Sequence, residues 1–328
     1  MVSDIPARIT IRDVAADTGL SIATVSRVLT GARTVTPEIA DRVRESARRL
    51  GYRADSIGRS LRTQRTNTLG LVIPDITNPF FPSLIQAIEH AARDRGLAVL
   101  IADADNDPAI EHAALKTLMD RRVDAVIISP TDRIASLPAL TSTARIVPTV
   151  QVDRVIDPAL PFARVNQSRP VSEIVRHLRS AGRRHFVFIG QPTTMATSFE
   201  RETAFIELMK ADYPGEEPRV QPGTTSPPTV REAALQILDR WPDTDAIICA
   251  NDLIGVGVLQ ALRSLDGPSD IAVSGFDDTL IAEAMGLTSV RQPVSLLAAA
   301  AMSSVFDAGL TTPQAELDAT VVFRNSTA

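Results

Sequence analysis

The sequence is poor in cysteine, in aromatic residues and in long apolar runs, and each shortage excludes a class of protein. A single cysteine, Cys249, cannot form a disulfide within the chain and favours a reducing compartment. No apolar run approaches the roughly 18 residues that a membrane-spanning helix needs, and the first residues lack the apolar core of a signal peptide. We therefore expect a cytoplasmic protein that does not cross a membrane.

Metal-binding and catalytic motifs are missing as well. The four histidines show no metal-ligand spacing, and the chain contains no Walker loop, no G-x-S-x-G motif and no cysteine pair. Gly255 and Gly257 fall within a predicted helix and lack the third glycine of a dinucleotide-binding fingerprint. We therefore predict no metal, no cofactor, no catalytic residues and no enzymatic activity.

What the sequence does have is an uneven distribution of charge. Residues 1–65 carry 12 arginines and 7 acidic residues, a net charge of +5, whereas residues 66–328 carry 22 basic and 32 acidic residues, a net charge of −10. A basic head on an acidic body indicates that the head binds a polyanion.

Residues 10–31 predict two short helices joined by a tight turn. Thr10 is a good N-cap, and Asp13 can complete a capping box. Gly19 ends the first helix, Ser21 caps the second, and Gly31 ends it. A third helix over residues 36–51 completes a small core. Such a helix-turn-helix can place its second helix in the major groove of DNA, and a plain helical hairpin is the alternative.

From residue 66 onward, short apolar runs alternate with helical stretches. This alternation predicts parallel sheets with right-handed crossovers. The runs are too many for one sheet, which favours two doubly wound α/β lobes. Strands are expected at residues 69–73, 98–102, 125–128, 147–152, 162–165, 186–189, 246–249 and 271–274.

Short motifs spread over nearly the whole chain carry a family resemblance. They are residues 21–29 (Ser-Ile-Ala-Thr-Val-Ser-Arg-Val-Leu), 50–52 (Leu-Gly-Tyr), 59–62 (Arg-Ser-Leu-Arg), 78–81 (Asn-Pro-Phe-Phe), 251–252 (Asn-Asp), 275–278 (Gly-Phe-Asp-Asp) and 324–327 (Arg-Asn-Ser-Thr). Together and in this order they resemble the LacI/GalR family of bacterial transcription regulators.

The resemblance implies a small all-α helix-turn-helix head at residues 1–53, a hinge helix or linker at 54–65, and a two-lobed α/β effector domain at 66–328, similar to periplasmic binding proteins. Lobe 1 is expected at about 66–166 and 292–328, and lobe 2 at about 167–291. A homodimer of such chains is expected to bind a pseudo-palindromic operator in double-stranded DNA.

The DNA contacts that the resemblance implies lie in the head and the hinge. In the family the hinge wedges a leucine into the minor groove, and Leu61 stands at that position. Gly58 stands where the family usually has alanine, which weakens a short helix. Ile22 and Ala23 occupy the two main specificity positions and, being apolar, are expected to read thymine methyl groups. The implied DNA-binding residues are Thr10, Ser21, Ile22, Ala23, Thr24, Ser26, Arg27, Gly58 and Leu61.

The resemblance also implies a small-molecule effector beyond the carboxyl ends of the strands, between the lobes. A sugar or sugar derivative is expected, and a purine or nucleoside is the alternative. Asn166 and Gln167, where the family usually has Asp-Asn, depart from the pattern. The implied effector-binding residues are Phe80, Phe81, Asp153, Arg201, Asn251 and Asp277.

Some of these residues have a purely structural alternative. Asn251 and Asp252 can be helix N-caps, Asp278 can serve the following turn, and Arg201 can pair with an adjacent glutamate at the surface. A periplasmic-type solute-binding protein would share the two-lobed architecture, but the basic head and the missing signal peptide argue against it. The sequence therefore predicts a DNA-binding transcription regulator, most simply a repressor, controlled by a small molecule.

Overall fold

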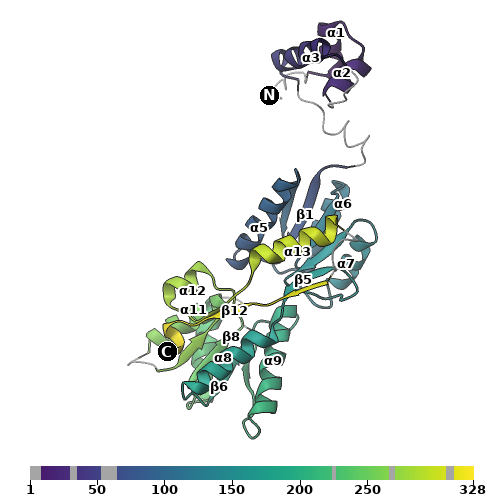
Figure 1. Cartoon of the computed structure of the whole chain (residues 1–328). Coiled ribbons are helices and arrows are strands. Elements are labelled where there is room, and N and C mark those ends of the chain that lie inside the picture. Colours follow the sequence, from purple (N-terminus) through teal and green to yellow (C-terminus); the bar gives the residue numbers. More distant parts are fainter. Residues whose placement is uncertain (1–8, 30–34, 53–64, 224–226, 266–269, 308–313) are drawn as a thin grey trace, which may run out of the picture. The chain divides into compact units, whose positions relative to one another are not determined.

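The computed structural model describes residues 9–29, 35–52, 65–223, 227–265, 270–307 and 314–328. The chain forms two compact units, one ending at Thr66 and the other running from Asn67 to Ala328 (Figure 1). The division between the units, after Thr66, lies one residue beyond the predicted start of the α/β domain at residue 66. Gly58 and Leu61 of the predicted hinge lie outside the described residues.

The first unit is a head of three helices around a small apolar core. Thr10 donates its backbone N–H and its hydroxyl to Asp13 Oδ2, at 2.7 and 2.8 Å, and so forms the predicted capping box. One valine from each helix is fully buried, and because α2 has only eight residues, this packing is what stabilises it. The helices are α1 (Ile11–Thr18), α2 (Ile22–Leu29) and α3 (Pro37–Leu50), and the buried valines are Val14, Val25 and Val43.

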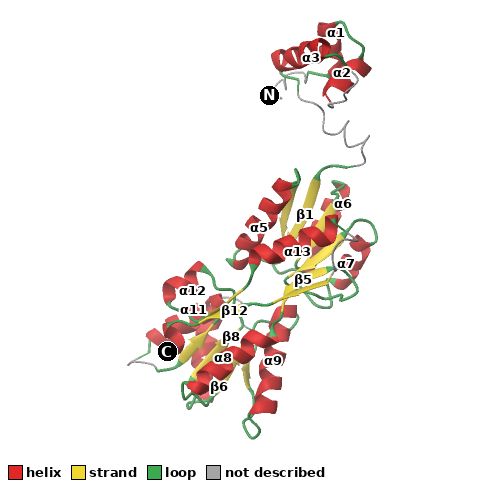
Figure 2. Ribbon diagram, viewed as in Figure 1, coloured by secondary structure: helices red, strands yellow, loops and turns green. Residues whose placement is uncertain are grey.

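Lobe 1 of the second unit is built on a six-stranded parallel sheet with the order β11-β5-β4-β3-β1-β2. Figure 2 shows this sheet, with β1 and β5 labelled, and the helices beside it. Side chains of β1 alternate between its faces: Leu71 packs with α5 and α13, whereas Val72 packs with α6 and α7. Gly70 lies on the second face, where a Cβ would come within 2.8 Å of Leu118. The elements are β1 (Thr68–Ile73), α5 (Phe80–Asp94), β2 (Ala98–Asp103), α6 (Pro108–Asp120), β3 (Ala125–Ile128), α7 (Leu137–Ala144), β4 (Thr149–Val152), β5 (Phe162–Val165), α13 (Val294–Phe306) and β11 (Gln314–Leu317).

Lobe 2 contains a four-stranded parallel sheet with the order β7-β6-β8-β9. Helix α8 packs against α9, and α10 packs against α11. Strands β6 and β8 are buried along their whole length, and Cys249, the last residue of β8, is only 2% exposed. The elements are α8 (Ser168–Ser180), β6 (Phe186–Ile189), α9 (Ala196–Asp212), β7 (Arg219–Gln221), α10 (Pro227–Arg240), β8 (Ala246–Cys249), α11 (Asp252–Arg263), β9 (Ala272–Ser274) and α12 (Leu280–Met285).

The C-terminal segment corrects the predicted lobe boundary. Strands β10 (Ser289–Arg291) and β12 (Thr320–Val322) pair antiparallel where the chain passes between the lobes. Beyond β12 the chain lies on lobe 2, since the Ser326 hydroxyl donates to Val273 O at 2.6 Å. Assigning all of residues 292–328 to lobe 1 is therefore wrong at its end. Helix α13 and strand β11 do return to lobe 1, but the hydroxyl-rich tail finds its hydrogen-bond partners in lobe 2.

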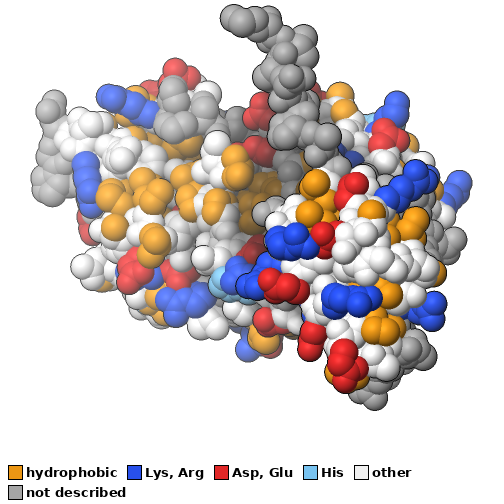
Figure 3. Space-filling model, turned by 90° about the horizontal axis from the view of Figure 1, so that it is seen from above, with side chains coloured by type: hydrophobic (Ala, Val, Ile, Leu, Met, Phe, Trp, Pro, Cys, Tyr) orange, Lys and Arg blue, Asp and Glu red, His pale blue; other side chains and the backbone are white. Residues whose placement is uncertain are grey.

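The surface carries charges of both signs. Figure 3 shows them interspersed over one face of the molecule rather than gathered by sign. Ion pairs such as Arg95–Asp307 and Arg219–Asp243, both at 2.7 Å, are partly exposed, where such pairs add little to stability. Among the described residues, no helix is long and apolar enough to cross a membrane.

Candidate functional site

The outer face of α2 presents most of the predicted DNA-contacting residues. Ile22 is 46% exposed, and Ala23 and Arg27 are exposed as well. Ser21 Oγ lies 2.9 Å from Thr24 Oγ1 and accepts the Thr24 backbone N–H at 3.2 Å, so Ser21 caps the helix as predicted. The Arg27 Nε donates to the carbonyl of Ala23 at 3.3 Å, which folds this side chain back along the helix.

Two other residues predicted to contact DNA are less available to it. Thr10 is exposed, but its hydroxyl and its backbone N–H are used in the capping box. Ser26 is only half-exposed. The first turns of α2 therefore present a mainly apolar surface formed by Ile22 and Ala23.

The arginines of α3 are exposed, but three of them are paired with acidic neighbours. These pairs lower the positive potential of α3 relative to what its arginine content suggests. The pairs are Arg44–Asp41 at 3.1 Å, Arg48–Glu45 at 2.6 Å and Arg49–Asp17 at 2.5 Å.

The six residues predicted to contact an effector lie together in the second unit. They line one small cavity at the carboxyl ends of strands from both lobes. Every one of their side chains is nearly inaccessible to solvent, with exposed fractions of 5% or less. The structure thus gathers Phe80, Phe81, Asp153, Arg201, Asn251 and Asp277 at one place.

Arg201 of α9 is held by neighbours from several elements. Its Nε donates to Gln167 Oε1 at 2.8 Å and its Nη1 to Ala250 O at 2.5 Å, while its Cζ lies 3.4 Å from the centroid of the Phe276 ring. Its Nη2 is 4.0 Å from Asp277 Oδ1. The alternative of a surface pair with an adjacent glutamate is therefore wrong, because the guanidinium is buried and faces the cavity.

Two aspartates share the cavity with two arginines. Burial raises the pKa of Asp277 to about 7, although the nearby Arg201 opposes the rise. Burial also raises the pKa of Asp153 against the opposing charges of Arg154 and Arg201, and it lowers the pKa of both arginines. The site therefore offers donors and acceptors whose charges nearly balance, which suits a neutral ligand rich in hydroxyl groups.

Phe80 and Phe81 form the apolar wall of the cavity. Their rings meet edge to face, with centroids 5.2 Å apart and an interplanar angle of 74°. The guanidinium carbon of Arg154 lies 5.7 Å from the Phe81 ring centroid. An aromatic face beside charged groups is a common arrangement in pockets that bind small molecules.

Asn251 and Asp252 separate into different roles. Asn251 Oδ1 accepts the Ile254 backbone N–H at 2.9 Å, so Asn251 caps α11 and also borders the cavity. Asp252 is the first residue of α11, and its carboxylate accepts hydrogen bonds from Thr279 and Ser289. The interpretation of Asp252 as a helix N-cap is therefore wrong, because Asn251 takes that position.

A larger cavity of about 300 Å³ adjoins the small one. Polar side chains surround the junction, and the far wall is apolar, which gives a ligand one polar and one apolar end. The residues common to both cavities are Asn78, Phe81, Arg154, Gln191 and Asn251, and the apolar wall consists of Val230, Leu253, Ile254, Val256 and Ile281.

Sequence reasoning missed Arg154, Gln167 and Gln292. Arg154 is 4% exposed, and its Nη1 makes only long contacts, at 3.3 and 3.4 Å, to two backbone carbonyls. Gln292 Nε2 donates to Asp277 Oδ1 at 2.8 Å. Among the described residues, Asp153 Oδ1, Arg154 Nε and Gln292 Oε1 are buried without a hydrogen-bond partner. Adjacency to Asp153 is the one signal that pointed to Arg154.

The geometry matches what comparisons with known proteins find. Residues 66–320 match the family described as periplasmic binding proteins and sugar binding domain of the LacI family, and residues 10–55 match the bacterial regulatory proteins of the lacI family. The transcriptional regulator DegA of Bacillus subtilis is 31% identical over 300 residues, which cover 88% of each chain. The regulator CelR of Thermobifida fusca is 31% identical over 304 residues, again 88% of each.

Solved structures share the fold. The lac repressor dimer bound to operator and the anti-inducer ONPF superposes with a TM-score of 0.86 at 20% identity, covering 98% of this chain and 99% of that one. The CelR–cellobiose complex gives a TM-score of 0.69 at 28% identity, covering 97% of this chain and 100% of that one. These relatives are regulators rather than enzymes. The chain belongs to the LacI family of bacterial transcription regulators.

Proposed function

We propose that this regulator represses transcription by binding a pseudo-palindromic operator as a homodimer, and that a sugar or sugar derivative between the lobes controls it. The observation that carries the proposal is the convergence of six side chains from both lobes on one buried cavity. A ligand that contacts both lobes favours one relative orientation of the lobes over others, and so can change the affinity for DNA.

The chemistry of the cavity supports a sugar-like ligand. Asp153, Asn251 and Asp277 supply acceptors, Arg201 supplies donors, and Phe81 supplies an apolar face. Hydroxyl groups both donate and accept, so they suit this mixture. Two relatives point the same way by name: the CelR structure holds cellobiose, and a ribose operon repressor of Halalkalibacterium halodurans is 28% identical over 299 residues.

A thermal-shift panel of sugars, sugar phosphates, nucleosides and purines tests the effector. A ligand at about 100-fold its Kd should stabilise the protein by about 2.7 kcal/mol. The matched variant Asp277→Asn keeps the shape of the side chain but replaces an acceptor by a donor, so its response to the same sugar should be lost. A response to purines or nucleosides alone would replace the sugar by the alternative class.

Selection of bound fragments from random DNA tests the operator. We expect a two-fold symmetric motif, with thymine opposite Ile22 and Ala23, because apolar side chains read the thymine methyl group. Arg27→Ala should relax the preference at one base pair per half-site, at a cost of about 1–3 kcal/mol. Arg48→Ala, on α3, is the control and should at most weaken all sequences alike. Selection that enriches no motif would contradict the proposal.

A further inference from the structure

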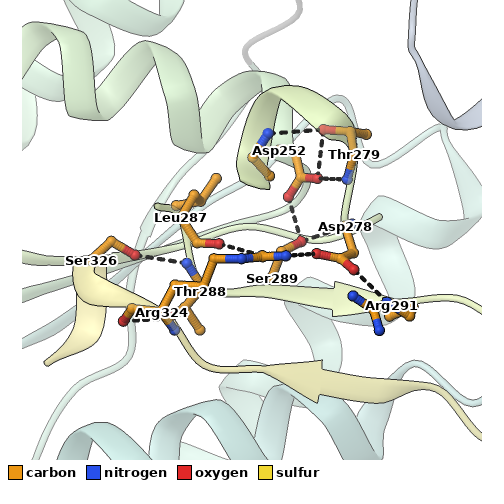
Figure 4. Close-up of polar contacts among 10 residues, drawn as sticks. Asp252, Asp278, Thr279, Leu287, Thr288, Ser289, Arg291, Arg324 and Ser326 are labelled. Atoms are coloured by element: carbon orange, nitrogen blue, oxygen red, sulfur yellow. Dashed lines mark hydrogen bonds and ion pairs between the residues drawn. The ribbon is translucent and has the colours of Figure 1, made fainter. Parts of the chain in front are cut away.

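The loop between β9 and α12 places two successive aspartates in a conformation that few residues adopt. Asp277 and Asp278 have φ angles of 109° and 50°. Residues other than glycine rarely occupy this left-handed region, because the Cβ crowds the backbone, and they stay there only where their surroundings hold them. Figure 4 shows the polar contacts that surround Asp278.

The Asp278 carboxylate is bound by two arginines from different segments. Arg291 Nε donates to Oδ2 and Arg324 Nη2 to Oδ1, each at 2.6 Å, and the carboxylate side chain is only 4% exposed. The Asp278 backbone N–H donates to Ser289 Oγ at 2.9 Å. The structural alternative for Asp278, a role in the following turn, is therefore wrong, because its carboxylate binds these two arginines. Because Arg291 lies on β10 and Arg324 follows β12, Asp278 joins the loop to both strands that pass between the lobes.

Arg324 is itself firmly placed. Its backbone N–H donates to Thr288 Oγ1 and its Nη1 to Leu287 O, both at 2.8 Å. Ser326 Oγ accepts the Thr288 backbone N–H at 2.8 Å (Figure 4). The C-terminal segment of residues 324–327 thus forms a fixed support under the loop.

A second carboxylate holds the loop directly after Asp278, where the chain enters α12. Asp252 Oδ2 accepts the backbone N–H of Thr279 at 2.7 Å and its hydroxyl at 2.9 Å. Gly275, just before the loop, must lack a side chain, because a Cβ there would come within 2.4 Å of Asp252 Oδ1. The loop is therefore bound after Asp277 by these hydrogen bonds, and before Asp277 it is held by the close packing of Gly275 and by the Gly275 N–H, which donates to Thr288 O at 2.8 Å.

This support determines where Asp277 points. The Asp277 backbone N–H donates to Val290 O at 3.0 Å, and its carboxylate lies 2.8 Å from Gln292 Nε2 and 4.0 Å from Arg201 Nη2. We propose that Arg324 is a positioning residue of the effector site, which holds Asp277 toward Arg201 through its ion pair with Asp278. The position of Asp277 is a structural question that does not depend on the effector. Only the role of Asp277 as an effector contact rests on the proposed function.

A titration without any ligand tests the position of Asp277. The carboxyl carbons of ¹³C-labelled aspartate are followed by NMR against pH, and Asp277→Asn identifies the signal of Asp277. The charged groups that face Asp277 are Arg201 from α9, Asp153 and Arg154 after β4, and Asp252 from α11.

In Arg324→Gln we expect the midpoint of Asp277 to fall by about one pH unit or more, toward an ordinary aspartate, because the released side chain gains water. Loss of the positive charge of Arg324 would by itself move the midpoint upward. The sign of the change therefore separates repositioning from a simple loss of charge.

Three variants make the test decisive. Arg219→Gln removes a two-pronged pair with Asp243, at 2.7 and 2.8 Å in the same lobe, and should leave the midpoint unchanged. Arg324→Lys keeps a cation beside Asp278, so its Asp277 midpoint should lie closer to that of wild type than to that of Arg324→Gln. Should Arg324→Gln fail to fold, Arg291→Gln removes the other cation from Asp278 and should move the midpoint in the same direction.

An unchanged or higher midpoint in Arg324→Gln, or in Arg291→Gln where that variant replaces it, would overturn the inference. A fall of equal size in Arg219→Gln would do the same, because the effect would then be a general loosening of lobe 2. Since the titration uses no ligand, a failure of the sugar panel would not touch this result.

Discussion

The effector cavity has a wall from lobe 1 and a wall from lobe 2, and the two walls differ in how completely the chain itself provides hydrogen-bond partners for their polar groups. On the lobe 2 side, Arg201 has partners at 2.8 and 2.5 Å and stacks on an aromatic ring, and Asn251 caps a helix. On the lobe 1 side, Arg154 has only long contacts, and its Nε and Asp153 Oδ1 lack a partner among the described residues. The chain itself therefore holds the polar groups on the lobe 2 side firmly, whereas it holds those on the lobe 1 side with fewer and longer hydrogen bonds. Stability should therefore depend on lobe 2, and ligand binding on both sides.

The largest effect on stability is expected from replacing Arg201, the buried cation on the lobe 2 side of the cavity. Arg201→Met should lower the free energy of unfolding by about 3 kcal/mol or more, because it leaves Gln167 Oε1 without its donor and removes the cation that faces the buried Asp277. Urea denaturation followed by circular dichroism measures the change. A loss below about 1 kcal/mol would mean that the chain does not hold the lobe 2 side firmly.

The next effect is a dependence on pH. Because the folded-state pKa of Asp277 is raised to about 7, its contribution to stability is complete below the unfolded pKa near 4 and is lost as the pH rises through 7. The unfolding free energy of wild type minus that of Asp277→Asn should therefore fall by at least about 1 kcal/mol from pH 5 to pH 8. Denaturation of both proteins at the two pH values measures it. A difference that grows with pH would contradict the raised pKa.

A smaller effect is expected from the glutamine that orients Arg201. Gln167→Ala removes the acceptor of Arg201 Nε and should cost about 1 kcal/mol of stability. Its effect on sugar binding should exceed its effect on unfolding, since the guanidinium is then free to rotate. Calorimetric titration beside urea denaturation compares the two, and equal effects would make Gln167 a structural residue only.

The smallest effect on stability is expected on the lobe 1 side. Arg154→Met removes a buried cation whose side chain makes only two long hydrogen bonds, at 3.3 and 3.4 Å, so few interactions are lost. Its unfolding free energy should stay within about 1 kcal/mol of wild type, while the thermal shift with a bound sugar falls. Destabilisation as large as that of Arg201→Met would abolish the distinction between the two sides.

The sequence predicted the buried strands well and the marginal ones poorly. The bounds of β3, β6 and β8 match the predicted runs, because short, fully apolar runs mark them clearly. Those of β5 match as well, although Arg164 interrupts its apolar residues. Val147 was expected in a strand but lies before β4, in the turn after α7, where its N–H bonds Thr143 O at 3.1 Å. Strand β7, with one apolar residue among its three, gives no such signal. Apolar content alone does not separate a buried turn from a strand.

The residues of the candidate site likewise fall into those that the sequence could place and those that it could not. Asn251 and Asp277 could be placed together because each follows a strand of the lobe 2 sheet, and the carboxyl ends of parallel strands meet at one edge of a sheet. Asp153 follows a strand of the lobe 1 sheet, and only the family resemblance placed it with them. The contacts of Gln292 and Arg324 could not be predicted, because they join residues 15 and 46 positions apart along a segment that passes between the lobes. Only the tertiary structure brings those partners together.

The burial of Cys249 has a practical consequence for measuring lobe motion. The thiol is 2% exposed, and burial raises its pKa well above its ordinary value, so it stays protonated and reacts slowly with maleimides. Because this is the single cysteine of the chain, a protein with one new surface cysteine on each lobe can be labelled with two dyes without replacing the native residue. Fluorescence energy transfer between such dyes would then report the distance between the lobes directly.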